Sequence, residues 1–175
     1  MAVGTGEGFV CLFNITGEGI DYKRVLDSQE GRILVLDCDG VHIATGSTNT
    51  IRVWNIKAGH PTPRMTTGRG VRKKGTIVWC VAITSDMTVI SGDSRGKTSF
   101  WKRKNGTLMD SVQSHKAEVL TLTVSGNETT AYTFSSGVDH TLMHFQVGHL
   151  NTCNLLQIVF IFSGYCERRW KTKVG

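Results

Sequence analysis

Residues 46–56 read GSTNTIRVWNI, and the rest of the chain can be interpreted outward from this stretch. It begins with small residues, passes through a polar turn and continues as an alternating run that ends near Trp54. Successive side chains of a strand point to opposite faces, so Ile51 and Val53 share one face while Arg52 and Trp54 share the other. The stretch therefore predicts a tight turn followed by a strand with an aromatic residue near its end.

Three other segments repeat this pattern. They are VGTGEGFVCLFNI, ISGDSRGKTSFWKR and FSSGVDHTLMHFQV, and they end near Phe13, Trp101 and Phe145. By subtraction, the four aromatic residues are 41, 47 and 44 positions apart. A period of ~40–45 residues is typical of the four-stranded blades of WD40 β-propellers. We expect Phe13, Trp54, Trp101 and Phe145 to pack between neighbouring blades; stacking platforms for nucleic-acid bases are the alternative.

The segments upstream of the last three aromatic residues repeat as well. RILVLDCDGVHIATGS, TIVWCVAITSDMTVISGD and AEVLTLTVSGNETTAYTFSSG each give an apolar strand, a polar turn and a second apolar strand. Each unit thus contains strands a, b and c, with d after the aromatic residue. The a–b turns are predicted at Asp39-Gly40, Ser85-Asp86 and Gly126-Asn127, and the b–c turns at Gly8, Gly96 and Asp139.

These units predict an all-β fold, a partial WD40 β-propeller of about three full blades plus a half blade over residues 1–147. Residues 1–15 would supply only strands c and d of the first blade, so we expect an incomplete ring, a piece of a larger propeller. A β-sandwich without repeats is the alternative. His115 after Ser114 resembles the Gly-His pair that opens a WD40 unit, but it occurs in one unit alone, so a His–Asp network is not required by the pattern.

Residues 148–175 form an atypical tail that contains no fifth unit. The tail has a short apolar run, Leu155–Phe162, followed by a basic end. The run is far shorter than the ~20 residues of a membrane-spanning helix, so no membrane partner is expected. We interpret the tail as a non-native continuation or a disordered segment; an idiosyncratic last strand is the alternative.

Charge and cysteine content restrict the function further. The net charge of +6 favours anionic partners such as nucleic acid, although a basic domain without such a role is equally compatible. The five cysteines form no CxxC pair, which argues against a zinc site or a disulfide framework. Cys11, Cys38 and Cys80 lie in apolar runs and are expected to be buried thiols of a reducing compartment.

The strongest candidate for an interaction site is the insert KAGHPTPRMTTGRGVRKKG, residues 57–75, which has no acidic residue. A basic loop at the rim of a blade could bind phosphates, and a solvated loop without a partner is the alternative. No aromatic residue lies within the insert, so base stacking is not supported. The candidate RNA- or partner-binding residues are Arg64, Arg69, Arg72, Lys73 and Lys74.

The sequence supports a catalytic or metal site less well than it supports the basic interaction site. His140, His144 and His149 mimic metal-ligand spacing, but two histidines four residues apart on a strand are ~13 Å apart, too far for one metal. The glycine-rich residues 4–8 lack the Gly-Lys-Ser/Thr ending of a phosphate loop. No positioned Cys/His pair or carboxylate pair is evident. We expect no enzyme activity, no metal, no cofactor and no small-molecule substrate.

The order of segments resembles the amino-terminal propeller of the cirhin family, WD40 proteins of the small-subunit processome. The cores IVWCVA, TVISGDSRGKTSFW and GTLM are the most similar, within residues 3–147. The chain departs from the family at KRKNG, where members usually have an acidic residue just after the tryptophan, at the shortened turn Ser47-Thr48-Asn49, and across the tail.

This resemblance implies two tandem propellers in the intact protein and a location in the nucleus, within the nucleolus. It also implies a non-catalytic scaffold role in pre-ribosomal RNA transcription and processing toward the 18S RNA, with other processome proteins and pre-ribosomal RNA as partners. The repeats alone support a WD40 interaction scaffold. The alternatives are a general WD40 adaptor, as in ubiquitin ligation or signalling, and, more remotely, a Cys/His hydrolase.

Overall fold

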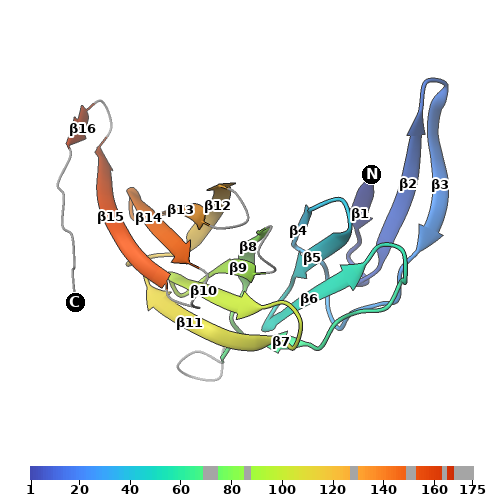
Figure 1. Cartoon of the computed structure of the whole chain (residues 1–175), viewed down its shortest axis with the longest axis horizontal. Coiled ribbons are helices and arrows are strands. Elements are labelled where there is room, and N and C mark those ends of the chain that lie inside the picture. The colour runs from blue at the N-terminus through green and yellow to red at the C-terminus, as the bar shows by residue number, and fades with distance from the viewer. Residues whose placement is uncertain (69–74, 85–87, 127–129, 149–152, 163–164, 168–175) are drawn as a thin grey trace.

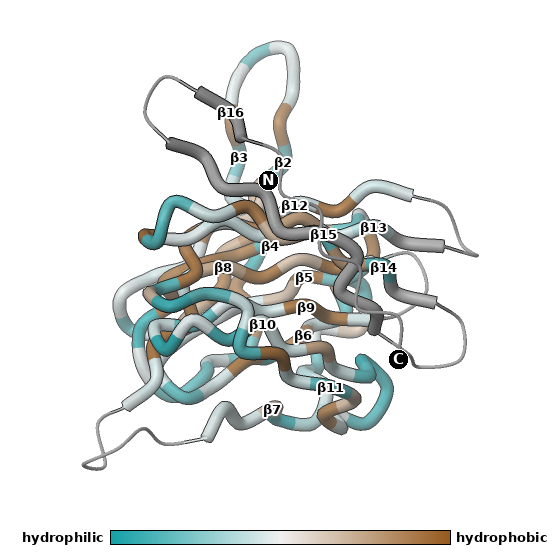
Figure 2. Tube along the Cα trace, turned by 90° about the vertical axis from the view of Figure 1, so that its left-hand side faces the viewer, coloured by the Kyte–Doolittle hydropathy of each residue, from teal (hydrophilic) through white to brown (hydrophobic). Residues whose placement is uncertain are grey.

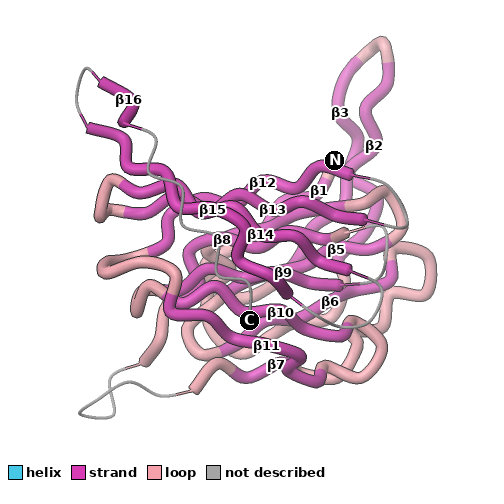
Figure 3. Tube along the Cα trace, turned by 60° about the vertical axis from the view of Figure 1, so that its left-hand side comes forward, coloured by secondary structure: helices cyan, strands magenta, loops and turns pink. Residues whose placement is uncertain are grey.

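Every regular element that the structure describes is a β-strand (Figure 3). The computed structural model describes residues 1–68, 75–84, 88–126, 130–148, 153–162 and 165–167. Its strands form four antiparallel sheets, with three, four, four and five strands in chain order. Short runs rich in Val, Ile, Thr and aromatic residues, separated by Gly, Asp and Asn, account for this all-β outcome.

Each sheet is one blade, and its strands follow one another in sequence order. Blade 1 contains β1 (Ala2–Gly4), β2 (Val10–Thr16) and β3 (Gly19–Val25). Blade 2 contains β4 (Val35–Cys38), β5 (His42–Gly46), β6 (Thr50–Asn55) and β7 (Met65–Thr66). Blade 3 contains β8 (Val78–Ile83), β9 (Thr88–Asp93), β10 (Lys97–Lys102) and β11 (Thr107–Gln113). Blade 4 contains β12 (Val119–Gly126), β13 (Thr130–Gly137), β14 (Thr141–Gly148), β15 (Cys153–Phe162) and β16 (Tyr165–Glu167).

The four blades follow one another along an open arc (Figure 1). This arrangement confirms the predicted all-β partial propeller. The prediction for blade 1 was wrong in detail: this sheet has three strands, not two, and reaches Val25 instead of ending at residue 15. The internal repeat did not predict β3. This strand pairs with β2 through a tight hairpin (Ile15 opposite Ile20) and exposes most of its side chains.

The segment Cys153–Phe162 pairs along β14, with Leu142 opposite Val159 and Val147 opposite Cys153. It therefore lies in the position of strand d of blade 4, and β16 adds a further strand outside it. That residues 148–175 are a non-native continuation remains a prediction.

Because neighbouring strands are antiparallel, the turns of a blade alternate between its two ends. The end with the b–c turns, which we call the b–c end, has one residue of positive φ in each blade. These residues are Gly8 (90°), Asn49 (60°), Gly96 (78°) and His140 (58°). The predicted b–c turns at Gly8, Gly96 and Asp139 are thus confirmed, and in blade 4 the left-handed residue is His140, next to Asp139. The a–b and c–d turns share the other end, which we call the c–d end; the predicted turns at Ser85-Asp86 and Asn127 lie outside the described residues.

Each cluster of buried apolar residues joins two neighbouring blades, and Figure 2 shows the hydrophobic stretches along the strands that supply them. Trp54 packs with Val10, Leu12 and Leu26 at the junction of blades 1 and 2. Trp101 packs with residues of blade 2, and Phe145 packs with Phe100 and Ile90 of blade 3. Each blade is therefore stabilised by its neighbours, as expected when a single sheet cannot cover its own apolar faces.

One backbone hydrogen bond recurs at each junction of blades. The N–H groups of Gln29, Thr67 and His115 donate to the carbonyls of Gly8, Asn49 and Gly96, at 2.9, 3.2 and 2.9 Å. All three donor residues are buried. The three positions are therefore equivalent, and they connect strand d of one blade to the b–c turn of the same blade before the chain enters the next.

The side chains of Gln29 and His115, at two of these equivalent positions, reach into the following blade. His115 bonds Ser135 Oγ through Nε2 at 2.8 Å and Asp139 through Nδ1 at 2.9 Å. Gln29 instead accepts a hydrogen bond from Thr45, whose hydroxyl also accepts from Trp54 Nε1. A His–Asp network thus forms between His115 and blade 4, although the sequence pattern did not require one.

The carboxylate of Asp139 titrates below its ordinary range. Burial raises its pKa, but hydrogen bonds from His115, the Lys116 N–H and Thr141 outweigh that effect, so the net pKa is lowered. A carboxyl whose pKa is lower when folded stabilises the fold fully above its unfolded pKa, and this contribution is lost as the pH falls through the folded pKa.

We expect Asp139→Asn to reduce the loss of stability on acidification below pH ~4, the ordinary pKa of aspartate. The measurement is the urea midpoint as a function of pH for the wild type and the variant. Asp21→Asn, which changes an exposed carboxylate of the β2–β3 hairpin, is the control and should leave the acid limb unchanged. Superimposable acid limbs for Asp139→Asn and the wild type would contradict the expectation.

Candidate nucleic-acid interface

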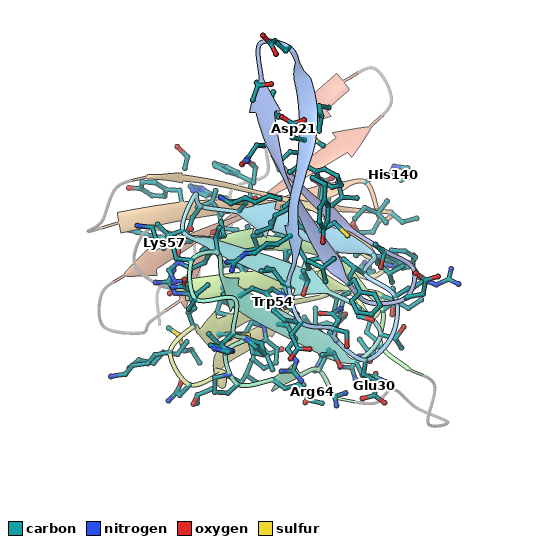
Figure 4. The ribbon with its side chains drawn as sticks, turned by 90° about the vertical axis from the view of Figure 1, so that its right-hand side faces the viewer. Asp21, Glu30, Trp54, Lys57, Arg64 and His140 are labelled. Atoms are coloured by element: carbon teal, nitrogen blue, oxygen red, sulfur yellow. The ribbon has the colours of Figure 1, made fainter. Side chains whose placement is uncertain are left out.

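The basic insert, predicted as a basic loop in the region where strand d was also expected, is divided between the two ends of blade 2. Strand β7 lies within it, and pairs Thr66 with Thr50 and Met65 with Ile51. Lys57 therefore belongs to the c–d end, whereas Arg64 lies beside Thr50 near the b–c end (Figure 4). Arg69, Arg72, Lys73 and Lys74 lie outside the described residues. The residues on either side of them, Gly68 and Gly75, are both at the b–c end.

Arg64 is the one member of the predicted basic set whose contacts the structure describes. Its Nε and Nη2 atoms donate to Thr50 Oγ1 at 3.1 and 2.7 Å, and its Nη1 donates to Glu30 at 3.0 Å. The Glu30 side chain is 80% exposed, and exposed ion pairs contribute little to stability. Glu30 accepts only this one bond from Arg64, and a phosphate oxygen can accept the same Nη1 donor in its place.

The segment that carries the other four basic residues is held at its base by Asn49. The N–H of Thr67 donates to the Asn49 carbonyl, the N–H of Asn49 donates to the Thr76 carbonyl at 2.7 Å, and the N–H of Thr76 donates to Asn49 Oδ1 at 2.6 Å. Thr76 Oγ1 also donates to the Gly68 carbonyl at 2.6 Å, so the two ends of the segment are joined directly.

Two functional candidates at this site were missed in the sequence. Asn49 was assigned to a shortened turn without a role. Arg95, at the b–c turn of blade 3, lies next to Gly68: a Cβ at Gly68 would be 3.7 Å from the Arg95 Nη2. Its guanidinium is also 3.7 Å from Asp93. The signal that could have identified Asn49 is its place in the repeat, where the equivalent residues are Gly8 and Gly96.

A second group of cations lies at the c–d end. Lys57, Lys102 and Lys104 are exposed there, whereas Arg103 is buried. Arg103 Nη1 contacts Asp39 Oδ2 at 3.1 Å and His42 Nδ1 at 3.0 Å, both in blade 2. Burial raises the pKa of Asp39, but hydrogen bonds from His42 and Val41 outweigh it and lower the pKa overall. Arg103, part of the unusual KRKNG stretch, therefore connects two blades and is not available to a partner.

Three of the four predicted anchors are buried. Trp54 and Phe145 are fully buried and Trp101 is 4% exposed, so these rings cannot stack on a base. Phe13 is only partly buried, and its ring meets that of the exposed Tyr22 edge-on, with centroids 6.0 Å apart. Leu12, on the other face of β2, packs in the junction with blade 2. The role of the four residues as blade anchors remains a prediction.

One arrangement among the described residues has the connectivity of a catalytic triad: Ser135 Oγ bonds His115 Nε2, and His115 Nδ1 bonds Asp139. Ser135 and His115 are both buried, so this hydroxyl does not face a substrate and the arrangement is a structural network.

His140 is exposed in a turn, and His144 stacks on Phe134 with ring centroids 4.4 Å apart, while His149 lies outside the described residues. No group of three His, Cys, Asp or Glu side chains among them could hold a metal ion. Burial raises the pKa of the Cys80 thiol to about 12, which disfavours the reactive thiolate at neutral pH. Cys38, expected to be buried, is exposed at the end of β4.

A cleft of ≈ 340 Å³ lies between blades 1 and 2, and its lining is mostly apolar, including Leu12, Leu36, Ile43 and Ile56. Lys23 and Cys38 also line it.

In the part of the chain that the structure describes, no helix is long and apolar enough to cross a membrane.

No protein-family model matches the chain. The chain is 39% identical over 175 residues to the U3 small nucleolar RNA-associated protein 4 homolog of Homo sapiens, an alignment that covers 97% of this chain and 24% of the human protein. It is 35% identical over 151 residues to U3 small nucleolar RNA-associated protein 4 of Schizosaccharomyces pombe and 32% identical over 155 residues to that of Saccharomyces cerevisiae. Each yeast alignment covers 83% of this chain, and 21% and 20% of the respective relatives.

The chain thus spans about a quarter or less of the length of these relatives. The human alignment omits only 3% of the chain, about five residues, and so extends into the segment 148–175. Among solved structures, the computationally designed Ika4 protein superposes with a TM-score of 0.66 over 84% of both chains, at 20% identity. That likeness concerns the fold alone.

Proposed function

We propose that the chain is a non-catalytic propeller scaffold of the small-subunit processome, acting in the nucleolus in the processing of pre-ribosomal RNA toward 18S RNA. The observation that carries the proposal is the similarity to U3 small nucleolar RNA-associated proteins of three organisms over most of this chain. These relatives are named for their association with a small nucleolar RNA, and a nucleolar scaffold that meets RNA is consistent with the +6 net charge.

The mechanism is geometric. Blades packed through buried junctions present their turns at fixed spacing, so partners bound at different blades are held in a defined relative position. At the b–c end, Arg64 contacts Thr50, and Arg95 lies next to Gly68, after which the basic segment begins. This end is the proposed contact for RNA phosphates, and other processome proteins would occupy the remaining rims.

Recovery of U3 small nucleolar RNA with the tagged chain tests the proposal. The full chain is expressed with an affinity tag in eukaryotic cells, and co-purified RNA is quantified against a tag-only control. We expect enrichment of U3 and pre-ribosomal RNA together with nucleolar fluorescence of the tagged chain. Recovery of ubiquitin-ligase or signalling proteins from the cytosol without U3 RNA would instead support the general adaptor.

A further inference from the structure

The cleft between blades 1 and 2 lies at the c–d end of the arc. Two of its lining residues mark this position, because Cys38 is the last residue of β4 and Ile56 directly follows β6. Phe13, Asn14 and Lys23 of the β2–β3 hairpin line it from the side of blade 1. The candidate RNA contact is at the b–c end, so the cleft is a separate surface of the molecule.

The interior of the cleft is apolar and its walls are joined. Four side chains of the cluster around Trp54 line it, namely Leu12, Leu36, Ile43 and Ile56. Arg24 of blade 1 donates from its guanidinium to the carbonyls of Ile56 and Lys57 of blade 2, so it connects the two sides. The volume of ≈ 340 Å³ is at the lower end of the range for ligand sites, which suits a short peptide segment with a large apolar side chain.

The charge at the rim of the cleft is positive. Lys23 is the one charged side chain among the lining residues, and it is exposed. Lys57 is also exposed and follows the lining residue Ile56 directly. Lys102 and Lys104 add exposed cations at the same end of blade 3. A ligand that fits the apolar interior would therefore bind more tightly if it also carried negative charge.

Acidic residues near the cleft do not offset these cations. Asp37 and Asp39, on either side of Cys38, are both engaged with blade 3. Asp37 accepts the N–H of Ile83 at 2.9 Å, and Asp39 pairs with Arg103 at 3.1 Å. Asp21 is exposed farther out on the hairpin, away from Lys57, and does not line the cleft (Figure 4).

We propose that this cleft docks a short acidic segment of another processome protein, with a large apolar side chain in the interior and carboxylates on Lys23 and Lys57. The inference rests on the proposed function for the source of the segment, whereas the chemistry of recognition follows from the cleft. Burial of the apolar side chain supplies affinity, and the lysines orient the segment and speed its association. An apolar interior favours such a side chain over the polar edges of a nucleobase, so a peptide fits better than RNA.

The first test is fluorescence anisotropy of the full chain with three labelled peptides. One is an acidic peptide of Asp and Glu with a central Leu-Phe pair, the second has Ala-Ala in place of that pair, and the third has Asn and Gln in place of the acidic residues. Loss of the apolar pair should weaken binding about tenfold to a hundredfold. The neutral peptide should bind about fivefold more weakly than the acidic one, and with little dependence on salt.

Two pairs of variants locate the binding. Cys38→Trp fills the cleft from its exposed side and should weaken binding of the acidic peptide at least tenfold, whereas Cys38→Ser leaves the cleft open and should bind as the wild type does. Lys23→Glu should weaken binding about fivefold or more, because it places a carboxylate against the acidic peptide. Lys102→Glu makes the same change of charge outside the cleft and should have little effect. Thermal melts identify any variant that is globally unfolded.

Cys38 also reports occupancy in the wild type, where no substitution is needed. The bound acidic peptide should slow alkylation of Cys38 by iodoacetamide, measured by mass spectrometry of the tryptic peptide that contains it. Cys11 is partly buried and does not line the cleft, so its rate of alkylation should stay the same.

The inference is overturned if the acidic peptide binds no more tightly than the other two peptides, or if it leaves Cys38 unprotected. Protection of Cys38 by polyuridine and not by the peptide would assign the cleft to RNA. Protection that rises with protein concentration alone would assign it to a second copy of the chain, and either result also overturns the inference. Recovery of U3 RNA without peptide binding contradicts this inference alone, whereas peptide binding without recovery of U3 RNA contradicts the proposed function alone.

Discussion

Alanine at Arg69, Arg72, Lys73 and Lys74 together is expected to lower the affinity of the chain for single-stranded RNA by on the order of a hundredfold at ~0.1 M salt. Each phosphate neutralised by a cation changes the slope of log K against log salt by about 0.7 for a single strand, so four contacts account for a slope of nearly 3. Titrations of polyuridine and U3 RNA at several salt concentrations measure both the affinity and the slope.

A control with equal charge separates position from net charge. Lys23, Lys57, Lys102 and Lys104 are all exposed, and the last three lie at the c–d end, away from Gly68 and Gly75, which flank the four cations. Changing these four to alanine removes the same charge and should weaken binding only slightly, with little change of slope. Equal losses in both variants would show that RNA responds to the overall charge and that the basic insertion is not a specific contact.

Trp54→Ala is expected to lower the free energy of unfolding by about 3–5 kcal/mol. The side chain is fully buried between blades 1 and 2, and its Nε1 donates to Thr45 Oγ1 at 3.1 Å, so the substitution leaves both a cavity and an unpaired hydroxyl acceptor. Natural domains have only about 5–15 kcal/mol of stability in total, so the variant would lose a large part of it. Urea denaturation followed by fluorescence and circular dichroism measures the change.

Two variants refine this expectation. Trp54→Phe retains an aromatic ring and removes the indole N–H, so it should cost less than Trp54→Ala. Phe13→Ala, at the matching position of blade 1, should cost about 1 kcal/mol because the Phe13 ring is only partly buried. If Trp54→Ala cost no more than Phe13→Ala, the blade-anchor role of Trp54 would be contradicted.

The repeat in the sequence predicted the fold because strands and turns depend on residue patterns within a few positions of the chain. Alternating apolar residues specify strands, and Gly8 and Gly96 specify turns of positive φ, whatever the rest of the chain does. Blade 1 was predicted incompletely because β3 exposes most of its side chains and so lacks the apolar signature of an inner strand. Cys38 was predicted to be buried because it lies in an apolar run, but it stands at the exposed end of β4.

The candidate site was predicted less fully. Composition pointed to the basic insert, but β7 contains only Met65 and Thr66, too short for any periodicity to reveal, and it divides the insert between two ends of the blade. Asn49 gave no signal in isolation, since its role depends on Thr76, 27 residues further along the chain. Four of the five predicted cations, Arg69, Arg72, Lys73 and Lys74, lie outside the described residues, so their part in binding remains a prediction.

By itself, then, the sequence determined the strand content and the order of the blades, because both follow from patterns within a few residues or from their repetition. Only the tertiary structure decided which side chains meet across blades. Arg103 contacts Asp39, which is 64 residues away along the chain. Asn49 holds the base of a segment whose two ends, Gly68 and Thr76, are 8 residues apart. Such contacts depend on how the sheets are placed side by side, and the residues that form them have no pattern of their own along the chain.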